Sequence, residues 1–161
     1  MKIKIIGYGW VGKAMKTLFP DALVHDPALG MIAEEKCDVA FICVPTPLID
    51  GVHDKDCVWM NSDCEYKATH KYCPHEEHKC NCILSKKLDT SIVEETIANC
   101  REDLIVCRST VMPGTCDKFP DKNIVFQPEY LGETVNHPMS DQKARPFIII
   151  GGKPENRRAV I

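Results

Sequence analysis

Three glycines near the N-terminus have the spacing of a phosphate-binding turn. They form G-x-G-x-x-G between an apolar, strand-like run and an amphipathic, helix-like run. In such a turn the first glycine permits the tight bend, the second lets a pyrophosphate approach the backbone, and the third lets helix and strand pack closely. The N-terminus of the helix then faces the phosphates. The motif predicts a dinucleotide site whose residues are Gly7, Gly9, Trp10, Val11 and Gly12.

Asp26 stands 14 residues beyond Gly12, at the end of a second strand-like run, residues 22–26. An acidic residue at this place accepts hydrogen bonds from the adenosine ribose and repels a 2′-phosphate. The pattern therefore favours NAD over NADP. A structural turn with a surface aspartate is the alternative interpretation.

A second group of residues with metal-binding chemistry lies in residues 53–87. It contains five of the ten cysteines and four of the six histidines: Cys57, Cys64, Cys73, Cys80, Cys82, His53, His70, His75 and His78. The segment has few apolar residues and cannot bury enough surface to fold alone, so a cross-link is expected. Thiolates favour zinc, and we expect a structural zinc held by Cys64, Cys73, Cys80 and Cys82. Cys57 and His78 are alternative ligands.

Other chemistries for this segment stay open. Disulfides or free thiols are one alternative and a catalytic metal with an open position is another, because no standard finger spacing is present. The five remaining cysteines, scattered among apolar neighbours, are expected to be small buried thiols: Cys37, Cys43, Cys100, Cys107 and Cys116.

The elements that must position these residues alternate along the chain. Strands are expected at residues 2–7, 22–26, 38–44, 103–109, 123–127 and 146–152, and helices at 7–19, 31–36, 90–100 and from 153 onward. This alternation predicts an α/β fold, a Rossmann-like doubly wound and mainly parallel sheet. We expect a single NAD-binding domain over 1–161, with the Cys/His-rich segment 53–87 as a stapled insertion.

Composition excludes several classes of function. The 161 residues are 44% hydrophobic and 27% charged, with a net charge of −3, so no electrostatic attraction to nucleic acid or an anionic membrane is expected. The apolar runs are strand-sized, and the N-terminus lacks the pattern of a signal peptide. A cytoplasmic protein with reduced thiols is the expectation.

Four further segments resemble the nucleotide-sugar 6-dehydrogenases, the UDP-glucose and GDP-mannose dehydrogenase family. In the family's order they are DVAFICVPTPLIDG (38–51), CRSTVMPGT (107–115), VFQPEYLGE (125–133) and ARPFIIIGG (144–152). The resemblance implies NAD as cofactor, bound further along by Val44, Pro45, Thr46, Pro47, Thr110 and Glu133. It also implies that Thr110 lies beside the nicotinamide and that Glu129 lies near the reacting carbon, as the two catalytic candidates.

Departures from the family pattern limit the expected activity. No segment matches the family's G-x-C-x-P-K-D, whose cysteine carries the second oxidation, and Cys116 lacks the flanking glycines that would let it substitute. The sugar-nucleotide domain is also absent, so the chain is expected to be a cut or split piece of a larger enzyme, or a minimal domain. Residues 26–38 are too short for the family's next strand–helix unit.

Two functions follow from these observations. The first is the NAD-binding domain of a nucleotide-sugar 6-dehydrogenase-like oxidoreductase, incomplete for the four-electron reaction. The alternative is a non-catalytic dinucleotide- or nucleotide-binding module whose insert docks a protein partner. The expected partners are NAD, a sugar nucleotide, and a protein partner or a second copy of the chain in a homodimer.

Overall fold

The computed structural model of the chain describes residues 1–50, 86–129 and 148–161. Two compact units are present, the first formed by Met1–Thr46 with Thr90–Ile161 and the second by Pro47–Asp89. Within the described ranges, no helix has the length and apolar character needed to cross a membrane.

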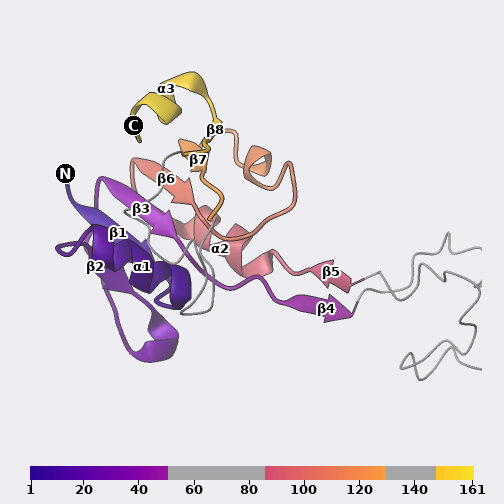
Figure 1. Ribbon diagram of the computed structural model, residues 1–161, viewed down its shortest axis with the longest axis horizontal. Helices are drawn as coiled ribbons and strands as arrows, with labels where there is room; N and C mark the ends of the chain where they lie inside the picture. Colours follow the sequence, from indigo (N-terminus) through magenta and orange to yellow (C-terminus); the bar gives the residue numbers. More distant parts are fainter. Residues whose placement is uncertain (51–85, 130–147) are drawn as a thin grey trace, which may run out of the picture. The chain divides into compact units, whose positions relative to one another are not determined.

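A six-stranded sheet in the order β2-β1-β3-β6-β7-β8 forms the centre of the first unit (Figure 1). All neighbouring strands are parallel except β7 and β8, which are antiparallel. The strands are β1 (Ile3–Ile6), β2 (Leu23–His25), β3 (Val39–Ile42), β6 (Leu104–Cys107), β7 (Ile124–Phe126) and β8 (Gly151–Gly152). The expected mainly parallel sheet is confirmed.

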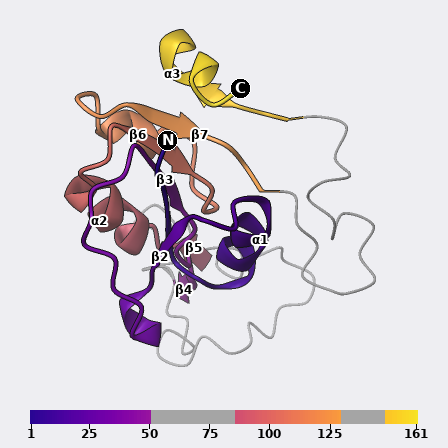
Figure 2. The same cartoon turned by 90° about the vertical axis from the view of Figure 1, so that its left-hand side faces the viewer.

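Helices cover both faces of this sheet. Helix α1 (Trp10–Leu18) contributes Met15 to one buried cluster, which also contains Val39 and Phe41 of β3. Helix α2 (Ser91–Asn99) contributes Val93 and Ile97 to a second cluster on the other face. Figure 2 shows α1 and α2 on opposite sides of the strands. Strand β3 is buried at every position because it has a helix on each face.

Three short elements complete the first unit. They are the 3₁₀ turns η1 (Pro27–Leu29) and η5 (Cys116–Lys118) and the helix α3 (Pro154–Arg158). Helix α3 is the one expected after residue 153. It follows β8 directly at the C-terminal end of the described chain.

The connection from β2 to β3 differs from the expectation. The helix predicted at residues 31–36 is wrong, and the only helical turn in this connection is η1, residues 27–29. The Asp26 side chain caps η1, and Gly30, at φ 70°, turns the chain back so that Met31 forms an antiparallel bridge with Asp26. A helix cannot start while the chain is returning along β2. The expected absence of a full strand–helix unit at this place is confirmed, and β2 is therefore an edge strand.

Strand β8 is shorter than predicted. It contains only Gly151 and Gly152 and runs antiparallel to β7, whereas a longer strand was expected over residues 146–152. Residues 146 and 147 lie outside the described ranges. Ile148 and Ile149 precede the strand and are exposed.

The second unit contains a two-stranded antiparallel hairpin. Strands β4 (Leu48–Asp50) and β5 (Lys86–Leu88) pair with Leu48 opposite Leu88 and Asp50 opposite Lys86. The Asp89 backbone N–H donates to the Pro47 carbonyl over 2.8 Å and continues this ladder. Residues 51–85, which include the Cys/His-rich segment, lie outside the described part of the chain.

Candidate functional site

The carboxyl ends of β1, β3, β6 and β7 meet at one edge of the sheet, because these strands are parallel neighbours. The glycine turn follows β1, residues 43–46 follow β3, Ser109 and Thr110 follow β6, and Glu129 follows β7. Open α/β sheets bind ligands in the crevice outside the carboxyl ends of their strands. The fold thus brings the first unit's predicted residues to the edge where such a ligand binds.

The three glycines of the turn have different surroundings. A Cβ on Gly7 would lie 2.6 Å from the Cys43 carbonyl oxygen, and φ at Gly7 is +90°. A Cβ on Gly12 would lie only 2.0 Å from the Gly7 carbonyl oxygen. A Cβ on Gly9 would meet nothing within 4 Å. Gly7 and Gly12 are therefore required by the packing of the turn, whereas Gly9 borders open space.

The start of α1 suits an anion. Gly9 is the N-cap of this nine-residue helix, and its first turn carries no acidic residue. The first intrahelical bond runs from the Lys13 N–H to the Gly9 carbonyl over 3.0 Å. N–H groups at a helix start point outward, and the helix dipole adds positive potential there. Trp10 and Val11 are the first two residues of the helix, and Trp10 is 52% exposed.

The Asp26 carboxylate is fixed beside the glycine turn. Its Oδ2 accepts a hydrogen bond from the Tyr8 backbone N–H over 2.7 Å, and its Oδ1 accepts one from the Leu29 N–H over 3.3 Å. The Gly7 N–H donates to the His25 carbonyl over 2.9 Å, so the turn and the end of β2 are joined by backbone as well. A carboxylate oxygen accepts more than one hydrogen bond, which leaves Asp26 able to accept from a ligand.

Ser109 ties the ends of β3 and β6 together. Its hydroxyl donates to the Val44 carbonyl over 2.7 Å, and its backbone N–H donates to the Ile42 carbonyl over 3.2 Å. The neighbouring Thr110 is exposed. Among the residues expected to line the cofactor, Val44 and Thr46 are half-buried and Pro45 is exposed, whereas Pro47 belongs to the second unit.

A buried arginine lies at the same edge and was not among the predicted site residues. Arg108 is 3% exposed, and its Nη1 donates to the Gln127 Oε1 over 2.8 Å. Burial raises the pKa of the Cys43 thiol to about 12, while the Arg108 charge lowers it and the Glu129 charge raises it. Both charged groups therefore lie near the end of β3. No local pattern marks Arg108 as buried, because a charged residue in a strand-like run is ordinarily predicted to face solvent.

Several predicted site residues lie outside the described ranges. These are Glu133 and the expected zinc ligands Cys64, Cys73, Cys80 and Cys82. Among residues 1–50, 86–129 and 148–161, no group of three or more His, Cys, Asp or Glu side chains is arranged to hold a metal ion. Of the five scattered cysteines, four are buried as expected and Cys116 is only half-buried.

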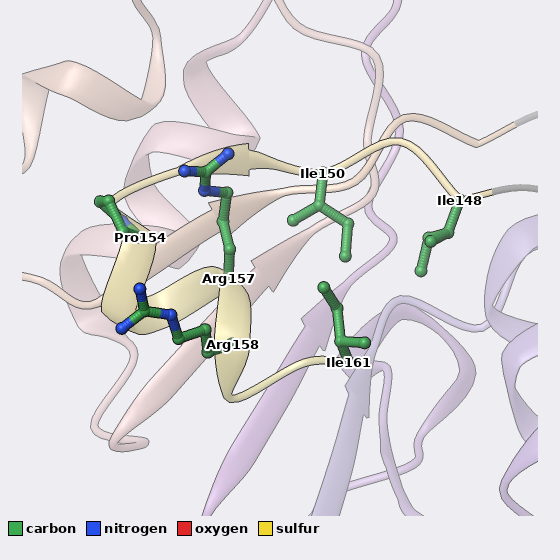
Figure 3. A pocket seen from close by; sticks show the side chains of 6 residues that line it. All are labelled: Ile148, Ile150, Pro154, Arg157, Arg158 and Ile161. Atoms are coloured by element: carbon green, nitrogen blue, oxygen red, sulfur yellow. The ribbon is translucent and has the colours of Figure 1, made fainter.

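A hollow of about 290 Å³ lies beside β8 and α3 (Figure 3). Its walls are largely aliphatic, with two arginines: Ile148, Ile150, Pro154, Arg157, Arg158 and Ile161. None of the predicted site residues lines it, so the hollow is distinct from the glycine turn.

No protein-family model and no curated protein matches the chain. A solved UDP-glucose dehydrogenase from the hyperthermophilic archaeon Pyrobaculum islandicum is similar, with 17% identity and a TM-score of 0.55 over 99% of this chain and 42% of that one. The UDP-N-acetyl-mannosamine dehydrogenase Cap5O from S. aureus is also similar, with 18% identity and a TM-score of 0.45 over 82% of this chain and 37% of that one. The chain therefore spans less than half the length of either protein. It has the Rossmann-like α/β fold found in part of a UDP-glucose dehydrogenase.

Proposed function

We propose that the chain binds NAD as the cofactor-binding domain of a nucleotide-sugar 6-dehydrogenase-like oxidoreductase. The observation that carries this proposal is the open space at Gly9, the N-cap of α1, in a turn whose Tyr8 N–H donates to the Asp26 carboxylate. A pyrophosphate must approach the backbone closely, which a glycine permits, and it is stabilised by the N–H groups at the start of a helix. The likeness of fold to a UDP-glucose dehydrogenase supports the same function.

The residues present fit the adenosine half of NAD. The pyrophosphate lies against Gly9, Trp10 and Val11 at the start of α1, where a side chain at Gly9 would intrude. Asp26 accepts hydrogen bonds from the ribose hydroxyls, and its negative charge disfavours the 2′-phosphate of NADP.

Residues at the ends of β3, β6 and β7 would hold the nicotinamide half. Val44, Pro45, Thr46 and Pro47 line this part of the cofactor, with Thr110 and Glu133 near the nicotinamide. When bound, NAD accepts a hydride from the substrate alcohol. Glu129 provides a carboxylate near the reacting carbon, and the Ser109 hydroxyl fixes the Val44 backbone by donating to its carbonyl.

The proposed substrate is a sugar nucleotide, and the reaction needs groups that this chain does not supply. The 161 residues contain no match to the cysteine segment that the family uses for its second oxidation, and they contain no sugar-nucleotide domain to hold the substrate for the first. We therefore expect this chain alone to produce no NADH from UDP-glucose and NAD. The absorbance of NADH measures this turnover. A rate of NADH formation above that of the mixture without protein would contradict this part of the proposal.

Calorimetric titration of Gly9→Ala with NAD tests the cofactor site. An added methyl group meets no protein atom but occupies the space of the pyrophosphate, so we expect NAD affinity to fall at least ~10-fold, about 1.4 kcal/mol. Loss of a glycine N-cap costs roughly 1 kcal/mol or less, so Tm should fall by no more than about 4 °C.

Gly151→Ala is the matched control. A Cβ at Gly151 would lie 3.8 Å from Phe126, an ordinary contact, on a strand that carries no proposed cofactor residue. This variant should keep its NAD affinity. Failure of the unaltered chain to bind NAD, or equal affinities for all three proteins, would overturn the proposal.

A further inference from the structure

Met31 lies directly opposite Asp26 in the short turn that follows β2. The Asp26 N–H donates to the Met31 carbonyl over 2.7 Å, and the Met31 N–H donates to the Asp26 carbonyl over 3.0 Å. Two residues that exchange both bonds in this way form a hydrogen-bonded antiparallel pair. The side chains of such a pair project from the same face, with their Cβ atoms about 5 Å apart. The Met31 side chain therefore lies beside the Asp26 carboxylate.

The Asp26 carboxylate has the glycine turn on one side and Met31 on the other. Strand β2 pairs with β1, and this pairing continues in the bond from the Gly7 N–H to the His25 carbonyl. The polar groups of successive strand residues point to opposite sides, so Asp26 bonds to Met31 on the outer side of β2, the edge strand. The carboxylate accepts from the Tyr8 N–H of the glycine turn over 2.7 Å. A ligand held by Asp26 is thus flanked by the turn and by Met31.

The surface beside Asp26 is apolar and open. Met31 is 38% exposed although its backbone is fixed by two hydrogen bonds. Gly30, at φ 70°, reverses the chain and brings Met31 to this position. A methionine thioether is polarisable and makes favourable contacts with aromatic rings. An exposed methionine next to a fixed carboxylate therefore offers a ring-binding surface beside a polar anchor.

We propose that Met31 is the contact surface for the adenine ring of the dinucleotide, an inference that rests on the NAD-binding function proposed above. In NAD the carbon that carries adenine is bonded to the carbon that carries the 2′-hydroxyl, so a ribose held by Asp26 places its base within reach of the adjacent side chain. The pyrophosphate leaves the same ribose through the 5′ carbon, toward Gly9. The base covers the Met31 thioether on the side away from the glycine turn.

Isotope-edited NMR of the unaltered chain tests this contact. The methionine methyl groups are labelled with ¹³C, and the Met31 signal is identified as the one that is absent from Met31→Leu. On addition of saturating NAD this signal should shift because of the adenine ring current, and NOEs should connect it to the ring protons of adenine. Binding of NAD measured by calorimetry, with no NOE from the Met31 methyl group, would overturn the proposal. Failure of the chain to bind NAD at all would overturn the proposed function as well.

Two alanine variants separate the ring contact from the structure of the turn. The bridge between residues 26 and 31 uses only backbone groups, so neither Met31→Ala nor Ile32→Ala removes it. We expect NAD affinity to fall about fivefold in Met31→Ala, which corresponds to ~1 kcal/mol for a methionine–ring contact, and to be largely restored in Met31→Leu.

Ile32→Ala is the matched control for Met31→Ala. Ile32 is also exposed and is the next residue of the returning chain. Neighbouring side chains of an extended segment point to opposite faces, so Ile32→Ala should keep its NAD affinity. Circular dichroism checks that each variant has the native fold. Equal losses of NAD affinity in the two alanine variants, or no loss in Met31→Ala, would contradict the assigned contact.

Discussion

Asp26 has a structural task in addition to its proposed contact with ribose. Its two carboxylate oxygens accept hydrogen bonds from the Tyr8 and Leu29 backbone N–H groups, which shapes both the glycine turn and η1. An asparagine keeps one of these acceptors but loses the negative charge. The substitution Asp26→Asn therefore tests the charge with little change to the turn.

We expect Asp26→Asn to weaken NAD binding by about fivefold, since replacing a charged acceptor by a neutral one costs ~1 kcal/mol. The preference for NAD over NADP should also decrease, because the repulsion of the 2′-phosphate is removed. Titration calorimetry with both dinucleotides measures the two effects. Asp38→Asn is the control, since that carboxylate is exposed and accepts from the Lys2 backbone N–H at the starts of β1 and β3, the opposite ends from the glycine turn. An unchanged ratio of NAD to NADP affinities in Asp26→Asn would contradict the assigned role.

At the scale of the elements, one buried carboxylate joins three strands at the edge opposite the glycine turn. Glu102, just before β6, forms an ion pair with Lys4 of β1 over 2.6 Å, and their side chains are only 3% and 7% exposed. Glu102 also accepts a 3.0 Å hydrogen bond from the Cys100 thiol and one from the Cys37 N–H ahead of β3. This ion pair and its hydrogen bonds hold the starts of β1, β3 and β6 in register.

Stability should depend on pH through Glu102. Burial alone would raise the pKa of this carboxyl, but the hydrogen bonds from Lys4 and Cys100 and the charge of Lys4 lower it to about 2, against an ordinary value of 4.5. The stabilisation is therefore complete above about pH 4.5 and is lost as the pH falls toward 2. Urea unfolding at a series of pH values should show the free energy of unfolding declining across this window.

Glu102→Gln identifies the group responsible. Removing one member of a buried ion pair leaves the Lys4 charge uncompensated and should lower the free energy of unfolding by about 3 kcal/mol at pH 7. The decline of this free energy between pH 4.5 and 2 should also be smaller in the variant than in the unaltered chain. The control Asp103→Asn removes an exposed partner of Lys36 and should cost less than ~1 kcal/mol. Equal losses of unfolding free energy in the two variants would show that the buried ion pair stabilises the fold no more than the exposed one.

The sequence predicted most elements because their apolar periods are clear, as in residues 38–44 and 90–100. The prediction was wrong at residues 31–36, where the Asp26 side chain caps η1 and the left-handed Gly30 turns the chain back. It also missed the buried Lys4 and Arg108, because a charged residue inside a strand is ordinarily predicted to face solvent. Their partners, Glu102 and Gln127, are 98 and 19 positions away, beyond the reach of local patterns.

At the scale of the whole molecule, the glycine motif alone predicts at which edge of the sheet the candidate site lies. The motif works because its residues are adjacent in sequence, and the strands that follow add their ends to the same edge. The hydrogen bonds from the Ser109 hydroxyl to the Val44 carbonyl and from the Cys107 thiol to the Ser109 carbonyl could not be predicted in this way. They depend on how the loop after β6 folds.

We further propose a structural zinc in the Cys/His-rich segment. The purified, reduced chain should contain about one zinc ion, since four thiolates satisfy a tetrahedral site. Replacing Cys73 with serine should lower the zinc content, and Cys37→Ser is the control because that thiol lies in the first unit. Metal analysis by mass spectrometry that finds less than about half an equivalent in the unaltered chain would contradict a structural zinc.

The hairpin of β4 and β5 has a consequence for protein engineering. Asp50 and Lys86 are direct partners in an antiparallel ladder, so the 35 residues between them begin and end at adjacent points. Two antiparallel strands need only a two-residue turn such as Asn-Gly to join them. The hairpin is thus a ready site for loop exchange, at which the Cys/His-rich segment can be deleted, transplanted or replaced by another module without altering the register of the strands that carry it.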